Sequence, residues 1–118
     1  MRDDHERLAD ILVAADKIRA RVRRGRDSFV ADEDLQIVLI HLVQVIGEAA
    51  SRVTPELTAQ HPRVPWRQIV GMRNRVVHDY FEIDLDILWA AVTHDVPRLA
   101  MQITLILSDP TVDSDRAG

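Results

Sequence analysis

The segment from Asp32 to about Val53 restricts the fold more than any other, because it is apolar on nearly every side of a helix. Asp32 is the expected N-cap, and the two acidic residues after it suit the positive end of the helix dipole. A helix that is apolar nearly all round must be buried on more than one side. In a chain of 118 residues, a second chain is a natural place for the excess. The main stripe consists of Leu35, Val38, Leu39, Leu42, Ile46 and Ala49, and the other sides carry Ile37, Ile40, Val43 and Val45.

Gly47 lies inside this expected helix, where glycine costs about 1 kcal/mol relative to alanine. A close approach of another helix is the expected compensation. Gln36, His41 and Gln44 interrupt the apolar run and argue against a membrane span. No segment reaches roughly 18 apolar residues without polar interruption, so no membrane-spanning helix is expected.

Helical periodicity also covers the N-terminal part of the chain. Apolar residues recur at steps of three and four over residues 8–22, in a helix that begins near Asp3 or Asp4 and ends by Gly25. Thr54 and Pro55 begin a short helix as cap and first-turn proline. Arginines at the end of the first helix either complement its dipole or form an RNA-facing patch. They are Arg19, Arg21, Arg23, Arg24 and Arg26.

Two more helices are expected in the second half of the chain. After a loop around Phe81–Ile83, Asp84 caps the last long helix. Pro97 must kink or divide that helix, and Asp95 offers a new cap if it divides. With no visible strand alternation, the pattern predicts an all-α domain over residues 1–108 and a polar, flexible tail over residues 109–118. The other helix begins near Pro65 and is expected to place Trp66, Ile69, Val70, Arg73, Val77 and Tyr80 on one side.

Composition excludes several classes of protein. The chain has no cysteine, which rules out a disulfide framework and a thiolate metal site. No two histidines have metal-ligand spacing, so neither a metal nor another cofactor is predicted. The net charge of -4 argues against a bulk nucleic-acid binder, and any RNA contact would have to be local. The N-terminus lacks the apolar stretch of a secretion signal, so a cytoplasmic protein is expected.

The segment Met72–Phe81 concentrates side chains that carry chemistry. The planar guanidinium of Arg73 suits phosphate, and the imidazole of His78 can both give and take a proton near neutral pH. Five residues place the two about 140° apart on a regular helix. They converge only if the helix loosens near Val77 or a second chain completes the site. An arginine on the apolar stripe also needs a partner, a polar cavity or an interface.

These groups suit RNA cleavage by attack of the ribose 2′-OH on the adjacent phosphate, a reaction that needs no metal. His78 would move a proton and Arg73 would stabilise the charge on the phosphoryl oxygens. Two copies across a two-fold axis would supply an acid and a base. The structural alternative is that Arg73 pairs with Glu48, His78 caps the helix end and Tyr80 is a core aromatic.

The wider sequence resembles HepT-like proteins, a branch of the HEPN superfamily, and the similarity runs from the first helix to about Leu107. The motif Arg73-x4-His78-x-Tyr80 is typical of that family. The other segments that resemble it in order and spacing are residues 46–50, 65–74 and 79–89.

The resemblance implies an up-and-down bundle of four to five helices that forms a homodimer and acts as the ribonuclease toxin of a toxin–antitoxin pair. Arg73 and His78 would be catalytic at the dimer interface, with Asn74 and Glu48 orienting the phosphate. The partner would be a nucleotidyltransferase antitoxin of the MNT type, which would silence the toxin by adenylylation of Tyr80. The alternatives are a dimer that binds nucleotide or RNA and the nucleotidyltransferase without cleaving, and a purely structural helical dimer.

Overall fold

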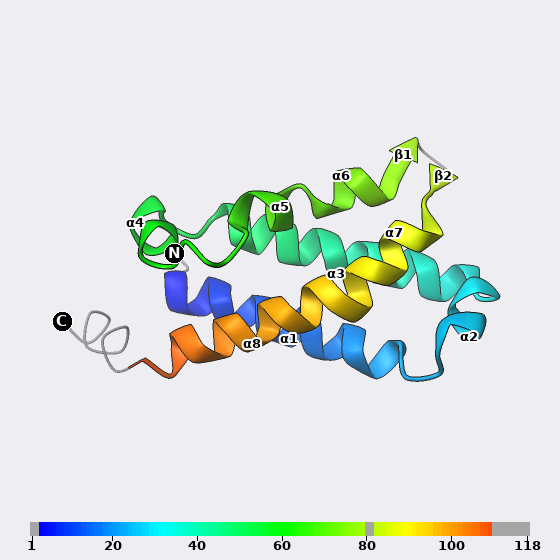
Figure 1. Cartoon of the computed structure of the whole chain (residues 1–118), viewed down its shortest axis with the longest axis horizontal. Coiled ribbons are helices and arrows are strands. Elements are labelled where there is room, and N and C mark those ends of the chain that lie inside the picture. Colours follow the sequence, from blue (N-terminus) through cyan, green and yellow to red (C-terminus); the bar gives the residue numbers. More distant parts are fainter. Residues whose placement is uncertain (1–2, 80–81, 110–118) are drawn as a thin grey trace.

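Three long helical segments form the frame of the molecule in the computed structural model, which describes residues 3–79 and 82–109 (Figure 1). They are α1 (Asp4–Arg21), α3 (Glu33–Ser51) and the run of α7 (Leu85–Ala90), the π-helical turn η1 (Ala91–Asp95) and α8 (Val96–Leu107). The shorter helices are α2 (Arg26–Val30), α4 (Pro55–Gln60), α5 (Trp66–Val70) and α6 (Met72–Val76). The expected all-α class is confirmed, while the division into a domain and a tail stays a prediction.

Helix α3 is the central element of this frame. It packs against α1 along one side and against α5 and α6 along the other, and α8 crosses in front of α1 (Figure 1). By length and composition α3 would also qualify as a membrane-spanning helix, contrary to the expectation that no segment would. The core helix of a globular domain passes the same test, and α3 occupies that place. Its buried residues are Gln36, Leu39, Leu42, Val43, Ile46, Gly47, Ala49 and Ala50.

Side-chain caps explain where the helices begin. The carboxylate of Asp32 accepts the N–H of Leu35 at 3.0 Å. Asp84 accepts the N–H of Ile87 at the start of α7, also at 3.0 Å. Thr54 caps α4 ahead of a first-turn proline. These three expected caps are confirmed, because a cap is a contact between residues only three positions apart.

The close helix approach expected at Gly47 is also confirmed. A Cβ built on Gly47 would lie 3.2 Å from the carbonyl oxygen of Val70 and 3.4 Å from that of Ile69. Glycine therefore lets the backbones of α3 and α5 come closer than any other residue would allow. This contact fixes how α5, and the motif segment that follows it, lie against α3.

The expectation of one helix from Pro65 to Tyr80, with no strand after it, is wrong. Gly71 separates α5 from α6, and the helix ends at Val76. Residues 77–79 form β1 (Val77–Asp79), which pairs antiparallel with β2 (Glu82–Ile83). In the register of this hairpin Val77 lies opposite Ile83. Pairing between β1 and β2 overrides the weak helical pattern there. Residues 80 and 81 lie outside the described part of the chain.

Pro97 lies in the first turn of α8, and the expected new cap at Asp95 is not found. Asp95 has helical backbone angles and its side chain makes no cap hydrogen bond. The chain instead widens into η1, where the N–H of Val96 donates to the carbonyl of Ala91. A π-turn of this kind accommodates the hydrogen bond that proline cannot donate. Helix α8 therefore continues beyond Pro97.

Helix α2 was not expected from the sequence. Its end is held by the buried side chain of Gln36, whose Nε2 donates to the carbonyls of Phe29 and Val30 at 3.0 and 3.1 Å. The ring of Phe29 packs against Trp89 of α7, with 5.0 Å between the ring centroids. A five-residue helix has too little periodicity to be read from sequence, and tertiary contacts stabilise it.

Replacing Gly47 with alanine should lower the free energy of unfolding by about 1 kcal/mol. Overpacking costs roughly 1–3 kcal/mol, and the gain in helix propensity returns about 1 kcal/mol of it. Urea unfolding followed by circular dichroism measures the difference. Gly71→Ala is the matched control, because its Cβ would meet the carbonyl oxygen of Arg67 at an ordinary 3.5 Å. Equal stability of the two variants would contradict the close approach.

Candidate active site

Arg73 lies in a small polar groove between α3 and the α5–α6 segment. The groove has a volume of about 360 Å³. Helix α6 contributes Arg73 and Asn74, and α3 contributes the carboxylate of Glu48. The close contact at Gly47 sets the width of the groove, because Gly47 itself forms part of its wall. The remaining lining residues are Gln44, Ser51 and Val70. The structure thus brings together three of the predicted site residues.

Arg73 is exposed, and the expectation that it lies on the apolar stripe of its helix is wrong. The buried residues of α5 and α6 are Ile69, Met72 and Val76. They follow steps of three and four. Ile69 was expected in the stripe, whereas Met72 and Val76 each come one position before the expected Arg73 and Val77. Arg73 and Val70 belong to the neighbouring face, which is open to solvent.

The guanidinium of Arg73 has no carboxylate within 4.0 Å among the side chains that the structure describes. Glu48 lines the same groove but accepts a hydrogen bond from Gln44 at 3.4 Å instead. The structural alternative of an Arg73–Glu48 ion pair is therefore not found. The donors of Arg73 remain available to an anionic ligand such as a phosphate.

His78 lies on β1, just beyond the end of α6, and half of its side chain is exposed. The expected loosening of the helix at Val77 is confirmed, since Val77 has extended backbone angles and is the C-cap of α6. The N–H that satisfies the helix end is the backbone N–H of Val77, which donates to the carbonyl of Arg73. His78 does not serve as the cap. Its Nε2 instead lies 3.6 Å from Oδ2 of Asp84.

Asp84 was expected only as a helix cap, and its contact with His78 was missed. The N–H of Ile87 holds the pKa of the Asp84 carboxyl below its usual value, and His78 acts in the same direction, while partial burial opposes both. The carboxylate is therefore ionised at neutral pH. Its cap contribution to stability is present above the ordinary pKa of an aspartate and is lost as pH falls through the lowered pKa. No sequence motif signals the contact, because hairpin pairing creates it.

The groove that Arg73 lines does not include His78 among its lining residues. His78 instead contacts Asp84. Tyr80, the expected site of adenylylation, lies outside the described residues. Loosening of the helix alone therefore leaves Arg73 and His78 in different surroundings, and their catalytic roles stay a prediction.

Three of the arginines at or just after the end of α1 have partners within the chain. Arg19 pairs with Asp16 at 2.8 Å. Arg21 donates to the carbonyl of Lys17 at 3.0 Å, which is the expected complement of a helix C-terminus. Arg26 pairs with Asp86 at the start of α7. For these three the structure favours the structural interpretation over an RNA-facing patch.

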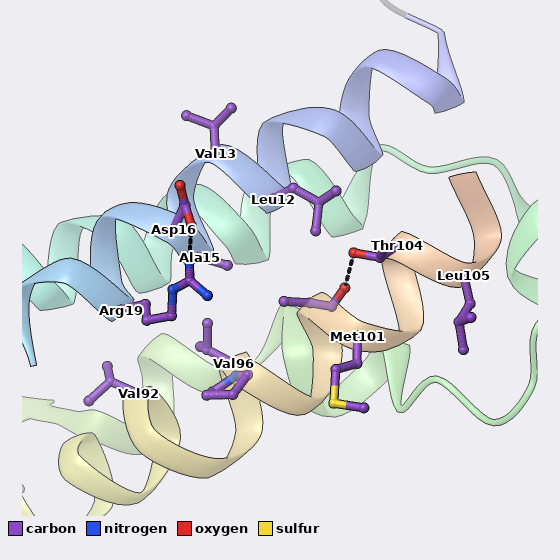
Figure 2. Close-up of a pocket in the computed structure, with 12 residues that line it drawn as sticks. Leu12, Val13, Ala15, Asp16, Arg19, Val92, Val96, Met101, Thr104 and Leu105 are labelled. Atoms are coloured by element: carbon purple, nitrogen blue, oxygen red, sulfur yellow. Dashed lines mark hydrogen bonds and ion pairs between the residues drawn. The ribbon is translucent and has the colours of Figure 1, made fainter. Parts of the chain in front are cut away.

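A larger groove between α1 and α8 contains none of the motif residues. Its volume is about 800 Å³. Figure 2 shows Val13 on α1 and Met101 and Leu105 on α8 beside it, together with the hydrogen-bonded Asp16 and Arg19. The carboxylate and the guanidinium there satisfy one another. The apolar lining offers little for acid–base chemistry, so the Arg73 groove is the better candidate for catalysis.

Comparison with known proteins agrees with the motif and the helical fold. The family model described as "Ribonuclease HepT-like" matches residues 11–106. The chain therefore belongs to the HepT-like ribonuclease family, a class of enzymes that cleave RNA, in the HEPN superfamily.

Two relatives illustrate the match. The chain is 32% identical to "Probable ribonuclease HepT" of Thermococcus cleftensis over 83% of its own length and 90% of the relative's. It is also 32% identical to "Putative RNase MJ1380" of Methanocaldococcus jannaschii, over 89% of its own length and 97% of the relative's. No solved structure matches the chain at a significant level.

Arg73→Ala should leave the free energy of unfolding within about 0.5 kcal/mol of the unaltered chain, as expected for an exposed residue away from structural contacts. The reason is that Arg73 is exposed and has no described carboxylate partner. Chemical unfolding measures this, with Arg75→Ala, an exposed neighbour on α6, as the matched control. A loss well above that of the control would indicate a structural role for Arg73 instead of a site for an anion.

Proposed function

We propose that this chain is a metal-independent endoribonuclease and the toxin of a HepT/MNT-type toxin–antitoxin pair acting in the cytoplasm. The observation that carries the proposal is the exposed guanidinium of Arg73, in a groove with Asn74 and Glu48 and without an ion-pair partner among the described side chains. The motif histidine follows on an extended strand. Membership of the HepT-like ribonuclease family supports RNA as the substrate.

In the proposed reaction the ribose 2′-OH attacks the adjacent phosphorus and the bond to the 5′ oxygen breaks. A base takes the proton of the 2′-OH, and an acid gives a proton to the leaving 5′ oxygen. The products are a 2′,3′-cyclic phosphate and a free 5′-hydroxyl. Arg73 stabilises the charge that builds on the phosphoryl oxygens. Asn74 and Glu48 orient the phosphate and the guanidinium across the groove.

A second copy of the chain completes the site in this proposal. The support is that His78 is not among the residues that line the Arg73 groove, together with exposed apolar side chains on the groove side of the molecule. Val70 of α5 lines the groove and is 44% exposed, and Ile37, two turns before Gln44 on the same side of α3, is 53% exposed. A homodimer formed over this face would cover them and bring the partner's motif toward the groove. Two copies of His78 then supply one base and one acid.

Tyr80 is the proposed point of control. A nucleotidyltransferase antitoxin transfers AMP from ATP to its hydroxyl, two residues from His78. The tyrosine oxygen bonds to the α-phosphorus, and pyrophosphate leaves with the proton of the hydroxyl passing to solvent. The adduct adds bulk and negative charge beside a site that must bind phosphate, so both volume and repulsion would exclude RNA.

The full chain free of adenylylation should cleave RNA in the presence of EDTA and leave a cyclic phosphate end. Arg73→Ala and His78→Ala should each lower the rate by about 10²-fold to 10⁴-fold, the range for loss of a charge-stabilising or acid–base group. Gel assay of an end-labelled oligonucleotide measures the rate, with a 2′-deoxy substrate as the negative substrate. Arg75→Ala and His94→Ala are matched controls, since both residues are exposed, Arg75 occupies an unspecified position of the motif and His94 lies outside it.

RNA that binds but stays intact, with binding weakened by both motif variants, would favour the non-cleaving dimer instead.

The shared site is tested by mixing the two inactive variants. A mixed dimer keeps one Arg73 and one His78 on opposite chains but lacks the second histidine, so only partial recovery of cleavage is expected after subunit exchange. No recovery in dimers shown to have exchanged would contradict a site in which Arg73 of one chain acts with His78 of the other.

Incubation with ATP and a nucleotidyltransferase antitoxin of the MNT type should increase the intact mass by whole AMP units and abolish cleavage. The hydroxyl of Tyr80 is the expected acceptor, so Tyr80→Phe should gain no mass and remain active. Mass spectrometry of the intact chain and of its peptides measures both. AMP found on another residue, or an adenylylated chain that still cleaves, would contradict this mode of control.

A further inference from the structure

We propose that Asp84 is the positioning residue for His78, and that it leaves Nδ1 as the ring nitrogen that exchanges a proton with RNA. This inference rests on the proposed ribonuclease function, because it assigns a partner and an atom to the proton-transfer step. It concerns a residue outside the Arg73–Tyr80 motif. The contacts of Asp84 with three different segments carry it.

Asp84 is held in place by its own backbone and by its cap. Its N–H donates to the carbonyl of Val76, the last residue of α6, at 2.8 Å. Its Oδ1 accepts the N–H of Ile87 at 3.0 Å. The carboxylate therefore cannot turn away without giving up the cap of α7. The second oxygen, Oδ2, is left to face Nε2 of His78 at 3.6 Å.

The position of the Asp84 carboxylate beside Nε2 determines which of the two ring nitrogens of neutral His78 carries the hydrogen. In the neutral imidazole one nitrogen carries hydrogen and the other accepts. An anionic acceptor facing Nε2 favours the Nε2–H tautomer, so the lone pair of Nδ1 is free to take the proton of the 2′-OH. The same carboxylate then stabilises the imidazolium that results. The distance of 3.6 Å suits an ion pair, and such contacts often shorten when substrate binds.

Other charged groups lie on the elements packed against β1, but they do not replace Asp84. Arg73 and Arg75 are on α6, and Glu82 is on β2. Asp86 is engaged by Arg26. Among the carboxylates whose side chains the structure describes, Asp84 is the one at ion-pair distance from the imidazole.

The substitution Asp84→Asn separates positioning from capping. Asparagine caps a helix about as well as aspartate, so α7 should keep its start while the negative charge is lost. Asp32→Asn is the matched control, because Asp32 caps α3 through the same three-residue contact, also at 3.0 Å, far along the chain from His78. Any general effect of changing a cap aspartate should appear in both variants.

The tautomer of His78 is measured on the full chain by ¹⁵N nuclear magnetic resonance, above the pH at which the ring titrates and without RNA. The signals of His78 are identified among the five histidines by their absence in His78→Gln. We expect the Nε2–H tautomer in the unaltered chain and in Asp32→Asn, and a clear shift toward Nδ1–H in Asp84→Asn. An unaltered chain with Nδ1–H, or the same tautomer in all three proteins, would overturn the proposal.

RNA cleavage provides the second readout. Asp84→Asn should lower kcat/KM by about 10-fold to 100-fold, less than the full contribution of an acid–base group, which is roughly 10²-fold to 10⁴-fold. Asp32→Asn should cleave at the normal rate. Normal cleavage by Asp84→Asn would overturn the proposal even if the tautomer changed. If the unaltered chain does not cleave RNA, the proposed function fails, but the tautomer still decides whether Asp84 positions His78.

Discussion

The contact between α3 and α5 at Gly47 is the constraint on which the candidate site depends. A side chain at this position would meet the carbonyl oxygens of α5, so only glycine lets the two backbones come this close. The same contact places the start of α6 beside α3, where Arg73 and Asn74 face Glu48. The groove is therefore a consequence of packing in the core, and its width depends on one residue that carries no chemistry.

The end of α6 supplies the second half of the arrangement. Extended backbone at Val77 stops the helix, and hairpin pairing with Ile83 turns the chain back toward α6. The backbone N–H of Asp84 then donates a hydrogen bond to the carbonyl of Val76. The chain leaves this turn directly into α7, so that one aspartate both begins a helix and faces His78. The position of His78 therefore depends on contacts at the start of α7 and not on the contacts that form the groove.

One chain holds the parts of the site without assembling them. The Arg73 groove and the His78–Asp84 pair are built by different contacts, and no described contact joins them. Ile37 of α3 and Val70 of α5 also leave apolar surface in water on the side of the molecule that carries the groove. Association over that face would remove this surface from water. A dimeric ribonuclease unites these two features more simply than a monomer does.

The sequence by itself determined the helical class, the caps at Asp32, Thr54 and Asp84 and the close approach at Gly47, because each rests on periodicity or on residues a few positions apart. It also offered loosening of the helix near Val77 as one of two ways to bring Arg73 and His78 together. Only the tertiary structure decided that Arg73 is exposed, since α6 buries Met72 and Val76, each one position before the expected Arg73 and Val77. The hairpin, the π-turn before Pro97, helix α2 and the approach of Asp84 to His78 were likewise beyond the sequence. They depend on which segments distant in the chain come together, and packing sets that where local propensity is weak.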